Sequence, residues 1–216
     1  MDLATQYAAT EFTLATELDA LYVEHPDLFL STISMIRGKG YKGKLSIATV
    51  VSGESSLQRV IGLDALPIDH LGIDFYVSMN NASLASHEKF YEPLYYLEKL
   101  VTLTTKPIVI SEVGYRSLEN GNRRPWFNYK LRGFEDQAVQ AASYEHFIEA
   151  FLCLDVDRVV GIDFWITDSQ YDYAEDVLHV PTQFDTLWRI GYSPFNKQAE
   201  RELVEYNQKR LWKKEK

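Results

Sequence analysis

Short apolar runs alternate along this chain with longer stretches in which apolar residues recur at helical spacing. The apolar runs predict five strands, over residues 11–16, 44–50, 70–76, 107–111 and 159–165. They are apolar on both faces, which is typical of parallel strands covered by helices. The periodic stretches predict helices over residues 2–9, 26–38, 56–63, 89–102, 134–154 and 197–212. Strands separated by helices indicate βαβ units and a parallel sheet.

The number of strands leaves two architectures open. A closed (β/α)₈ TIM barrel needs eight strands, so five βα units would make an incomplete barrel. An open doubly wound sheet could also be built from five strands. In both architectures ligands bind at the carboxyl ends of the strands. We expect one α/β domain over residues 1–216, with a long functional loop over residues 117–133, which is rich in Gly, Asn, Arg and Pro.

Two glutamates stand at the ends of apolar runs. Glu17 closes the run that begins at Phe12, and Glu112 closes the run that begins at Pro107. A carboxylate at the end of a buried strand is costly unless something uses it. Two such carboxylates on different strands of a parallel sheet are what hydrolysis of a sugar bond needs, one as proton donor and one as nucleophile.

Each glutamate also has a structural interpretation. Arg116 could keep Glu112 ionised, which suits a nucleophile, or it could pair with Glu112 only to hold the following loop. Partial burial would raise the pKa of Glu17, as a general acid requires. Glu17 could instead be an acid near a helix N-terminus, an interpretation that Asp19 fits better.

Other side chains at the predicted strand ends could contact a ligand or fill the core. Tyr76 could orient a carboxylate or cap the barrel, and Trp165 could lie under a sugar ring or pack in the core. Asp74 and Asp163 each follow Gly-Ile within a strand and need partners that the sequence does not identify.

Composition narrows the function further. The net charge is −9 and the pI is about 5.1, and an acidic surface repels phosphate backbones, so we expect no nucleic-acid partner. Cys153 is the only cysteine, and the five histidines form no metal-binding motif. We therefore expect no metal and no cofactor. No run approaches the length of a membrane span and no leader segment is evident, so we expect no membrane partner and a cytoplasmic location.

Several segments resemble glycoside hydrolase family 113, whose members are (β/α)₈ enzymes of a large retaining clan and mostly endo-β-1,4-mannanases. Residues 14–18 resemble the Ile-Gly-Thr-Glu-Leu segment of that family's fourth strand, and residues 112–117 resemble the Glu-Ile-Gly-Tyr-Arg-Ser of its seventh. Pro125-Trp126 falls where the family has Pro-Trp in the next loop. Residues 137–151 resemble the family's seventh helix, and residues 192–200 the start of its terminal helix.

The resemblance implies a role for each matched residue. Glu17 corresponds to the acid/base and Glu112 to the nucleophile. Tyr76 corresponds to the sixth-strand tyrosine beside the nucleophile, and Trp165 to the eighth-strand tryptophan under the bound sugar. Arg116 and Trp126 are also expected to contact the substrate. The implied substrate is a β-1,4-linked polysaccharide or oligosaccharide, with β-mannan preferred.

The chain departs from the family pattern in ways that keep other functions open. Ala15 replaces a glycine and Gln198 a proline, and the likeness begins at the fourth strand, so we expect the chain to lack strands one to three. The chain could therefore be a truncated, inactive half-barrel that pairs with itself or another chain through its open edges. A carbohydrate-binding scaffold that uses Trp126 and Trp165 without hydrolysis is a third alternative.

Overall fold

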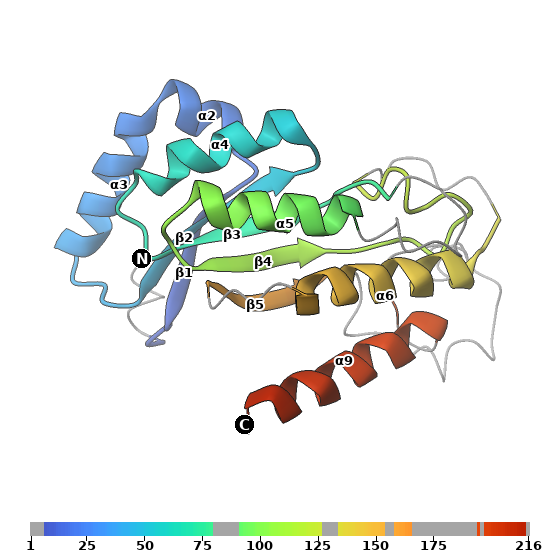
Figure 1. Ribbon diagram of the computed structural model, residues 1–216. Coiled ribbons are helices and arrows are strands. Elements are labelled where there is room, and N and C mark those ends of the chain that lie inside the picture. Colours follow the sequence, from blue (N-terminus) through green and yellow to red (C-terminus); the bar gives the residue numbers. More distant parts are fainter. Residues whose placement is uncertain are drawn as a thin grey trace, which may run out of the picture. The chain divides into compact units, whose positions relative to one another are not determined.

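A computed structural model describes residues 7–79, 91–126, 134–153, 158–165, 194 and 197–214. Five strands form one sheet in the order β1-β2-β3-β4-β5 (Figure 1). The strands are β1 (Glu11–Thr16), β2 (Lys44–Val51), β3 (His70–Phe75), β4 (Ile108–Val113) and β5 (Val159–Phe164). All five predicted strands are confirmed, and the predicted bounds differ by no more than two residues.

Six helices lie within the described residues. They are α2 (Asp19–Glu24), α3 (Pro26–Gly38), α4 (Glu54–Asp64), α5 (Tyr91–Leu103), α6 (Gln137–Cys153) and α9 (Gln198–Lys214). The sequence pattern missed α2, because six residues are too few to show helical periodicity. The helix predicted over residues 2–9 lies mostly outside the described residues, and its last part, at residues 7–8, is a turn.

The strand order decides between the two architectures. The pairs β1–β2, β2–β3 and β3–β4 are parallel, and each strand lies beside its neighbour in the sequence. A doubly wound sheet reverses direction partway through its strand order, whereas a barrel adds its strands one after another. The sheet is therefore five consecutive units of a (β/α)₈ barrel, and the open doubly wound alternative is wrong.

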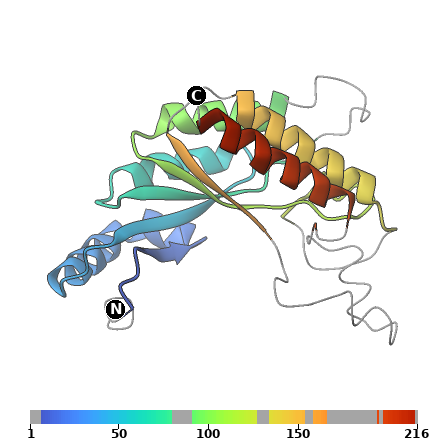
Figure 2. The ribbon, with the colours of Figure 1, turned by 90° about the horizontal axis from the view of Figure 1, so that it is seen from below.

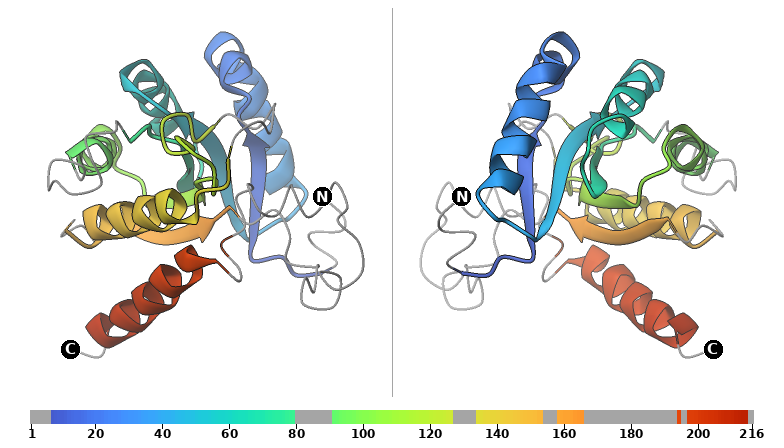
Figure 3. Two further views of the ribbon diagram at one scale, coloured as in Figure 1. Left: turned by 90° about the vertical axis from the view of Figure 1, so that its right-hand side faces the viewer. Right: turned by 90° about the vertical axis from the view of Figure 1, so that its left-hand side faces the viewer.

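The chain divides into two compact units, and the first contains the sheet. This unit comprises Met1–Phe75, Leu97–Val113 and Val156–Asp163. Its core is built by the two central strands, since Leu45, Ile47, Leu71 and Ile73 have no exposed surface. Helices α3 and α4 lie on the outer side of the curved sheet (Figure 3). Burial on both faces of β2 and β3 explains why apolar residues predominate in these strands and do not alternate with polar ones.

The second unit comprises Tyr76–Tyr96, Gly114–Asp155 and Phe164–Lys216. Within it α6 and α9 run side by side (Figure 2). The segment that follows β4 is bound to these two helices. Gln140 on α6 donates a hydrogen bond of 2.8 Å to the backbone oxygen of Tyr115, and Nζ of Lys197, just before α9, donates one of 2.8 Å to Oγ of Ser117.

The predicted loop over residues 117–133 is described as far as Trp126 and consists of turns there. Residues 127–133 lie outside the described residues. An isolated antiparallel bridge joins Leu118 to Glu135. None of the helices in the described ranges combines the length and the apolar character that a membrane crossing requires. The expectation of a single domain stays a prediction.

Candidate active site

Glu17 follows the last residue of β1 in a backbone conformation that is rare for its type. Its φ angle is 57°, in the left-handed region. Such a conformation costs a residue with a side chain about 1–3 kcal/mol and is found most often at functional sites. The amide of Glu17 donates a hydrogen bond of 3.1 Å to the backbone oxygen of Ala48, which holds the turn against β2. The turn leaves the Glu17 side chain exposed at the strand end.

Glu112 is the second-to-last residue of β4, because the strand ends at Val113, two residues beyond the predicted end. Its backbone pairs with that of Asp74 on β3, and the register shifts between Ile73 and Asp74. A similar shift occurs on β1 between Thr13 and Thr16. Irregularities of this kind redirect side chains and are common beside active sites.

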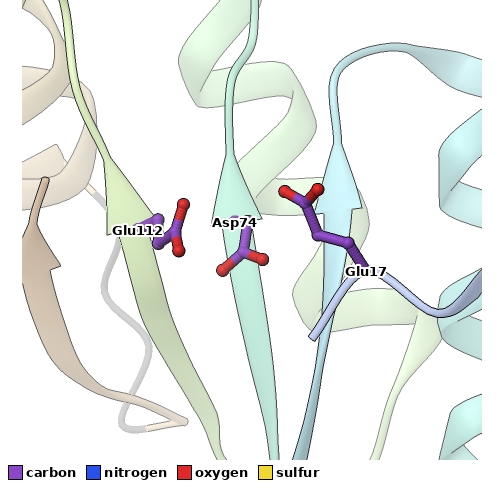
Figure 4. A group of neighbouring side chains, drawn as sticks. All are labelled: Glu17, Asp74 and Glu112. Carbon is purple, nitrogen blue, oxygen red and sulfur yellow. The ribbon is translucent and has the colours of Figure 1, made fainter. Parts of the chain in front are cut away.

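The three acids Glu17, Asp74 and Glu112 converge at the strand ends, with Asp74 between the two glutamates (Figure 4). One carboxylate oxygen from each lies within 4.8 Å of those of the other two. All three belong to the first compact unit. The structure thus brings together two glutamates that are almost a hundred positions apart in the sequence.

Asp74 is the buried member of this group. It has no exposed surface, and its Oδ1 accepts a hydrogen bond of 2.6 Å from Oγ of Ser111 on β4. Gly72 makes room for this arrangement, since a Cβ there would lie 2.9 Å from Oγ of Ser111 and 2.9 Å from Cβ of Ala48. Burial raises the pKa of Asp74 to about 7, although the hydrogen bond from Ser111 opposes the shift.

The charge around Glu17 favours its protonated form. Although the Glu17 side chain is exposed, partial burial of its carboxyl group, and then the negative charge of Asp19, raise the pKa of Glu17 above its ordinary value. Asp19 itself is paired: Arg59 on α4 forms a salt bridge with its Oδ2, and Oγ1 of Thr49 donates a hydrogen bond of 2.7 Å to its Oδ1. Asp19 is the first residue of α2, as the interpretation of it as a helix N-terminal acid requires.

Carboxylate oxygens at this spacing could also contact a divalent cation. Calcium takes six to eight oxygen ligands, and magnesium needs an octahedral set. Among the described residues, the carboxylates close enough to share a cation are those of Glu17, Asp74 and Glu112, which together offer three acids as ligands. The two glutamates at the strand ends fit acid–base and nucleophilic chemistry with no further ligand.

The remaining predicted site residues belong to the second unit. Tyr76 and Arg116 are buried there, at 7% and 3% exposure, whereas Trp126 and Trp165 are exposed at 44% and 38%. Their contacts with a substrate or with the glutamates stay predictions. Exposure leaves the rings of Trp126 and Trp165 available to stack on a sugar. The burial of Arg116 also fits a purely structural role.

Sequence reasoning gave Asp74 no role, although it recognised that a buried acid there needs a partner. The available signal was the position of Asp74 near the end of the apolar run Leu71-Gly72-Ile73, since Glu17 and Glu112 also stand at the ends of apolar runs. What the pattern could not supply was Ser111, which reaches Asp74 from the neighbouring strand.

Comparison with solved structures supports the fold. A structure of a GH113 β-1,4-mannanase matches with a TM-score of 0.69 and 22% identity, over 95% of this chain and 58% of that one. A complex structure of a GH113 β-1,4-mannanase matches with a TM-score of 0.67, 20% identity and the same coverage. A GH113 β-mannanase from Alicyclobacillus acidocaldarius gives a TM-score of 0.66 at 17% identity, over 95% of this chain and 56% of that one.

These matches confirm the resemblance to family 113 at the level of fold. They also show that the chain spans less than three fifths of the length of these mannanases. The sequence matches no protein-family model and no curated protein.

Proposed function

We propose that this chain acts as a retaining glycoside hydrolase on β-1,4-linked polysaccharide, with β-mannan as the preferred substrate. The observation that carries the proposal is the approach of Glu17 and Glu112, which bring carboxylate oxygens within 4.8 Å of each other at the strand ends. Retaining glycosidases place their two carboxyl groups about 5–5.5 Å apart, whereas inverting enzymes need about 6.5–9.5 Å to admit a water molecule. The spacing here supports the retaining class.

The two glutamates divide the work. Glu112 attacks the anomeric carbon and forms a covalent glycosyl ester while Glu17 gives its proton to the leaving glycosidic oxygen. Glu17 then takes a proton from a water molecule, which attacks the same carbon and releases the sugar from Glu112. The raised pKa of Glu17 suits a group that must hold a proton in the first step and accept one in the second.

The sugar is inferred from the structural neighbours. Two of the neighbours described above are β-1,4-mannanases and the third is a β-mannanase, and this chain shares their fold over most of its length. The exposed rings of Trp126 and Trp165 offer apolar faces of the kind that stack on sugars. We include Tyr76 and Arg116 as substrate-binding residues on the family resemblance.

A direct test is release of reducing ends from β-1,4-mannan by the purified chain. We expect Glu112→Gln to lower the rate by at least about a thousandfold, since the covalent step is lost. The matched control is Glu24→Gln, which changes an exposed glutamate at the end of α2 and should leave the rate unchanged.

A second measurement addresses the mechanism. A 2-deoxy-2-fluoro-mannosyl fluoride traps the nucleophile of retaining enzymes as an ester, and peptide mass spectrometry should find the label on Glu112. With an aryl mannoside whose leaving group needs no acid, azide should restore turnover to both Glu17→Ala and Glu112→Ala. Glu17→Ala should give the β-mannosyl azide, because azide opens the glycosyl ester on Glu112, and Glu112→Ala should give the α-azide, because azide displaces the leaving group directly. A label on another residue would contradict the assignment.

Two outcomes would favour the other functions. Absence of hydrolysis together with oligomers that grow with concentration would indicate an inactive half-barrel that associates through its sheet edges. Binding to mannan that survives loss of both glutamates, without hydrolysis, would indicate a carbohydrate-binding scaffold.

A further inference from the structure

Within the described part of the chain, one carboxyl oxygen of Asp74 lacks a hydrogen-bond partner. Its Oδ1 accepts from Ser111, but its Oδ2 is buried and has no hydrogen-bond partner among the described residues. A buried ionised oxygen without a donor costs several kcal/mol, because nothing replaces the water that it has lost. A protonated oxygen in the same place would itself be a donor and would need only an acceptor.

Acceptors are what the surroundings of Asp74 provide. Glu112 faces it from β4 as its backbone pairing partner, and Glu17 faces it from the end of β1 (Figure 4). Asp19 at the start of α2 adds a further negative charge, whereas Arg59 on α4 is paired with Asp19. Ser111 on β4 contributes a hydroxyl. Asp74 is therefore influenced by the hydroxyl of Ser111 and by the negative charges of Glu112, Glu17 and Asp19.

Three ionised acids within 4.8 Å would repel one another strongly. The chemistry of a retaining glycosidase requires Glu112 to be ionised and Glu17 to exchange its proton. Asp74 has no such duty and is the most deeply buried of the three, so the proton is least costly there. Active sites elsewhere keep a carboxylic acid neutral near pH 7 so that it can donate a hydrogen bond.

We propose that Asp74 is a positioning residue that remains protonated while the site works and donates its Oδ2 proton to the carboxylate of Glu112. This inference rests on the proposed glycosidase function. The hydrogen bond would hold the nucleophile in one rotamer and keep the charge of the site low enough for Glu112 to ionise. Ser111 orients the donor by occupying Oδ1. The raised pKa of Asp74 agrees with this role.

The amide of asparagine is a mimic of the protonated acid, with Oδ1 as acceptor and Nδ2 as donor. Asp74→Asn should therefore keep kcat within about threefold of the parent, whereas Asp74→Leu should lower kcat at least about tenfold with little change in KM. Asp163→Asn, an exposed aspartate in the same local sequence, is the matched control and should change neither constant. Equal losses in the asparagine and leucine variants would overturn the proposal.

A titration without substrate separates this inference from the proposed function. The ¹³C carboxyl resonance of Asp74, assigned by its absence in Asp74→Asn, should have a midpoint near pH 7. Glu112→Gln should lower that midpoint, since it removes a negative charge and leaves only a neutral, weaker acceptor beside Asp74. The titration of Asp74 and its change in Glu112→Gln do not use Asp74→Leu, so they test the inference even if that variant does not fold.

The outcomes are distinct. Hydrolysis that depends on Glu112, together with an Asp74 that is ionised at pH 6, would overturn the positioning role and leave the function intact. A midpoint that falls on addition of calcium chloride would overturn it in favour of a cation site. Hydrolysis that is indifferent to Glu112→Gln would overturn the proposed function itself.

Discussion

The tetrapeptide Gly-Ile-Asp-Phe occurs twice, at residues 72–75 in β3 and at residues 161–164 in β5. Strand β3 lies between β2 and β4, and each of its residues is buried. Strand β5 is at one end of the sheet in the described part of the chain, and none of its residues is buried. Identical local sequence therefore gives two environments, and the place of the strand in the sheet decides between them.

The two aspartates show the chemical consequence. Asp74 is fully buried beside Ser111 and two glutamates, whereas Asp163 is exposed. Burial raises the pKa of both, and in Asp163 the negative charge of Glu11 adds to the effect. The same residue type is thus a buried member of the acid cluster on β3 and an exposed acid on β5.

The largest loss of stability among these variants should follow truncation of a phenylalanine. Phe75 has no exposed surface, so Phe75→Ala should lower the free energy of unfolding by about 3–5 kcal/mol. Phe164 is half-buried, with ring centroids 5.7 Å from Tyr144 and 6.1 Å from Tyr206, and Phe164→Ala should cost roughly half as much. Urea unfolding with matched m-values measures both. Equal losses of stability in the two variants would contradict the claim that the place of the strand in the sheet sets the environment of the residue.

The aspartates should differ in how they link stability to pH. The pKa of Asp74 is about 7 in the folded protein, against about 4 for an unfolded aspartate. The folded state therefore binds this proton more tightly, and stability falls as pH rises from about 4 to about 7.

Asp74→Asn removes that loss, so the variant should gain stability relative to the parent across this window. The gain is on the order of 1.4 kcal/mol for each unit of pKa shift. Asp163→Asn should change the slope much less, because water screens an exposed group. Urea midpoints at pH 4, 5.5 and 7 test both variants. If the stability of Asp74→Asn fell with rising pH as steeply as that of the parent, the argument from burial would be wrong.

The smallest difference is expected at the glycines. A Cβ on Gly72 would crowd Ser111 and Ala48, so Gly72→Ala should cost about 1–3 kcal/mol and disturb the hydrogen bond to Asp74. A Cβ on Gly161 would lie 3.6 Å from Val109, at ordinary contact distance, and Gly161→Ala should change stability by about 0.5 kcal/mol or less. Thermal unfolding of the two alanine variants measures both costs. A large loss of stability in Gly161→Ala would contradict the looser packing that we infer for β5.

Much of the fold could be predicted because the relevant signals are local. The helix from Pro26 to Gly38 was predicted to the residue, since a proline in its first turn and glycines after it mark the ends. The short helix α2 could not be predicted, because one and a half turns carry no period. Glu17 and Glu112 were found by their positions at the ends of apolar runs, but the positive φ of Glu17 left no mark in the sequence.

The sequence by itself determined which segments are strands, that they pair in parallel, and that two glutamates stand at their carboxyl ends, because periodicity and residue type act within a few positions along the chain. The consecutive strand order, the convergence of three acids within 4.8 Å and the burial of Asp74 rather than Asp163 were set by the packing of the strands in three dimensions. These depend on which strands become neighbours, and contacts between neighbouring strands join residues tens of positions apart.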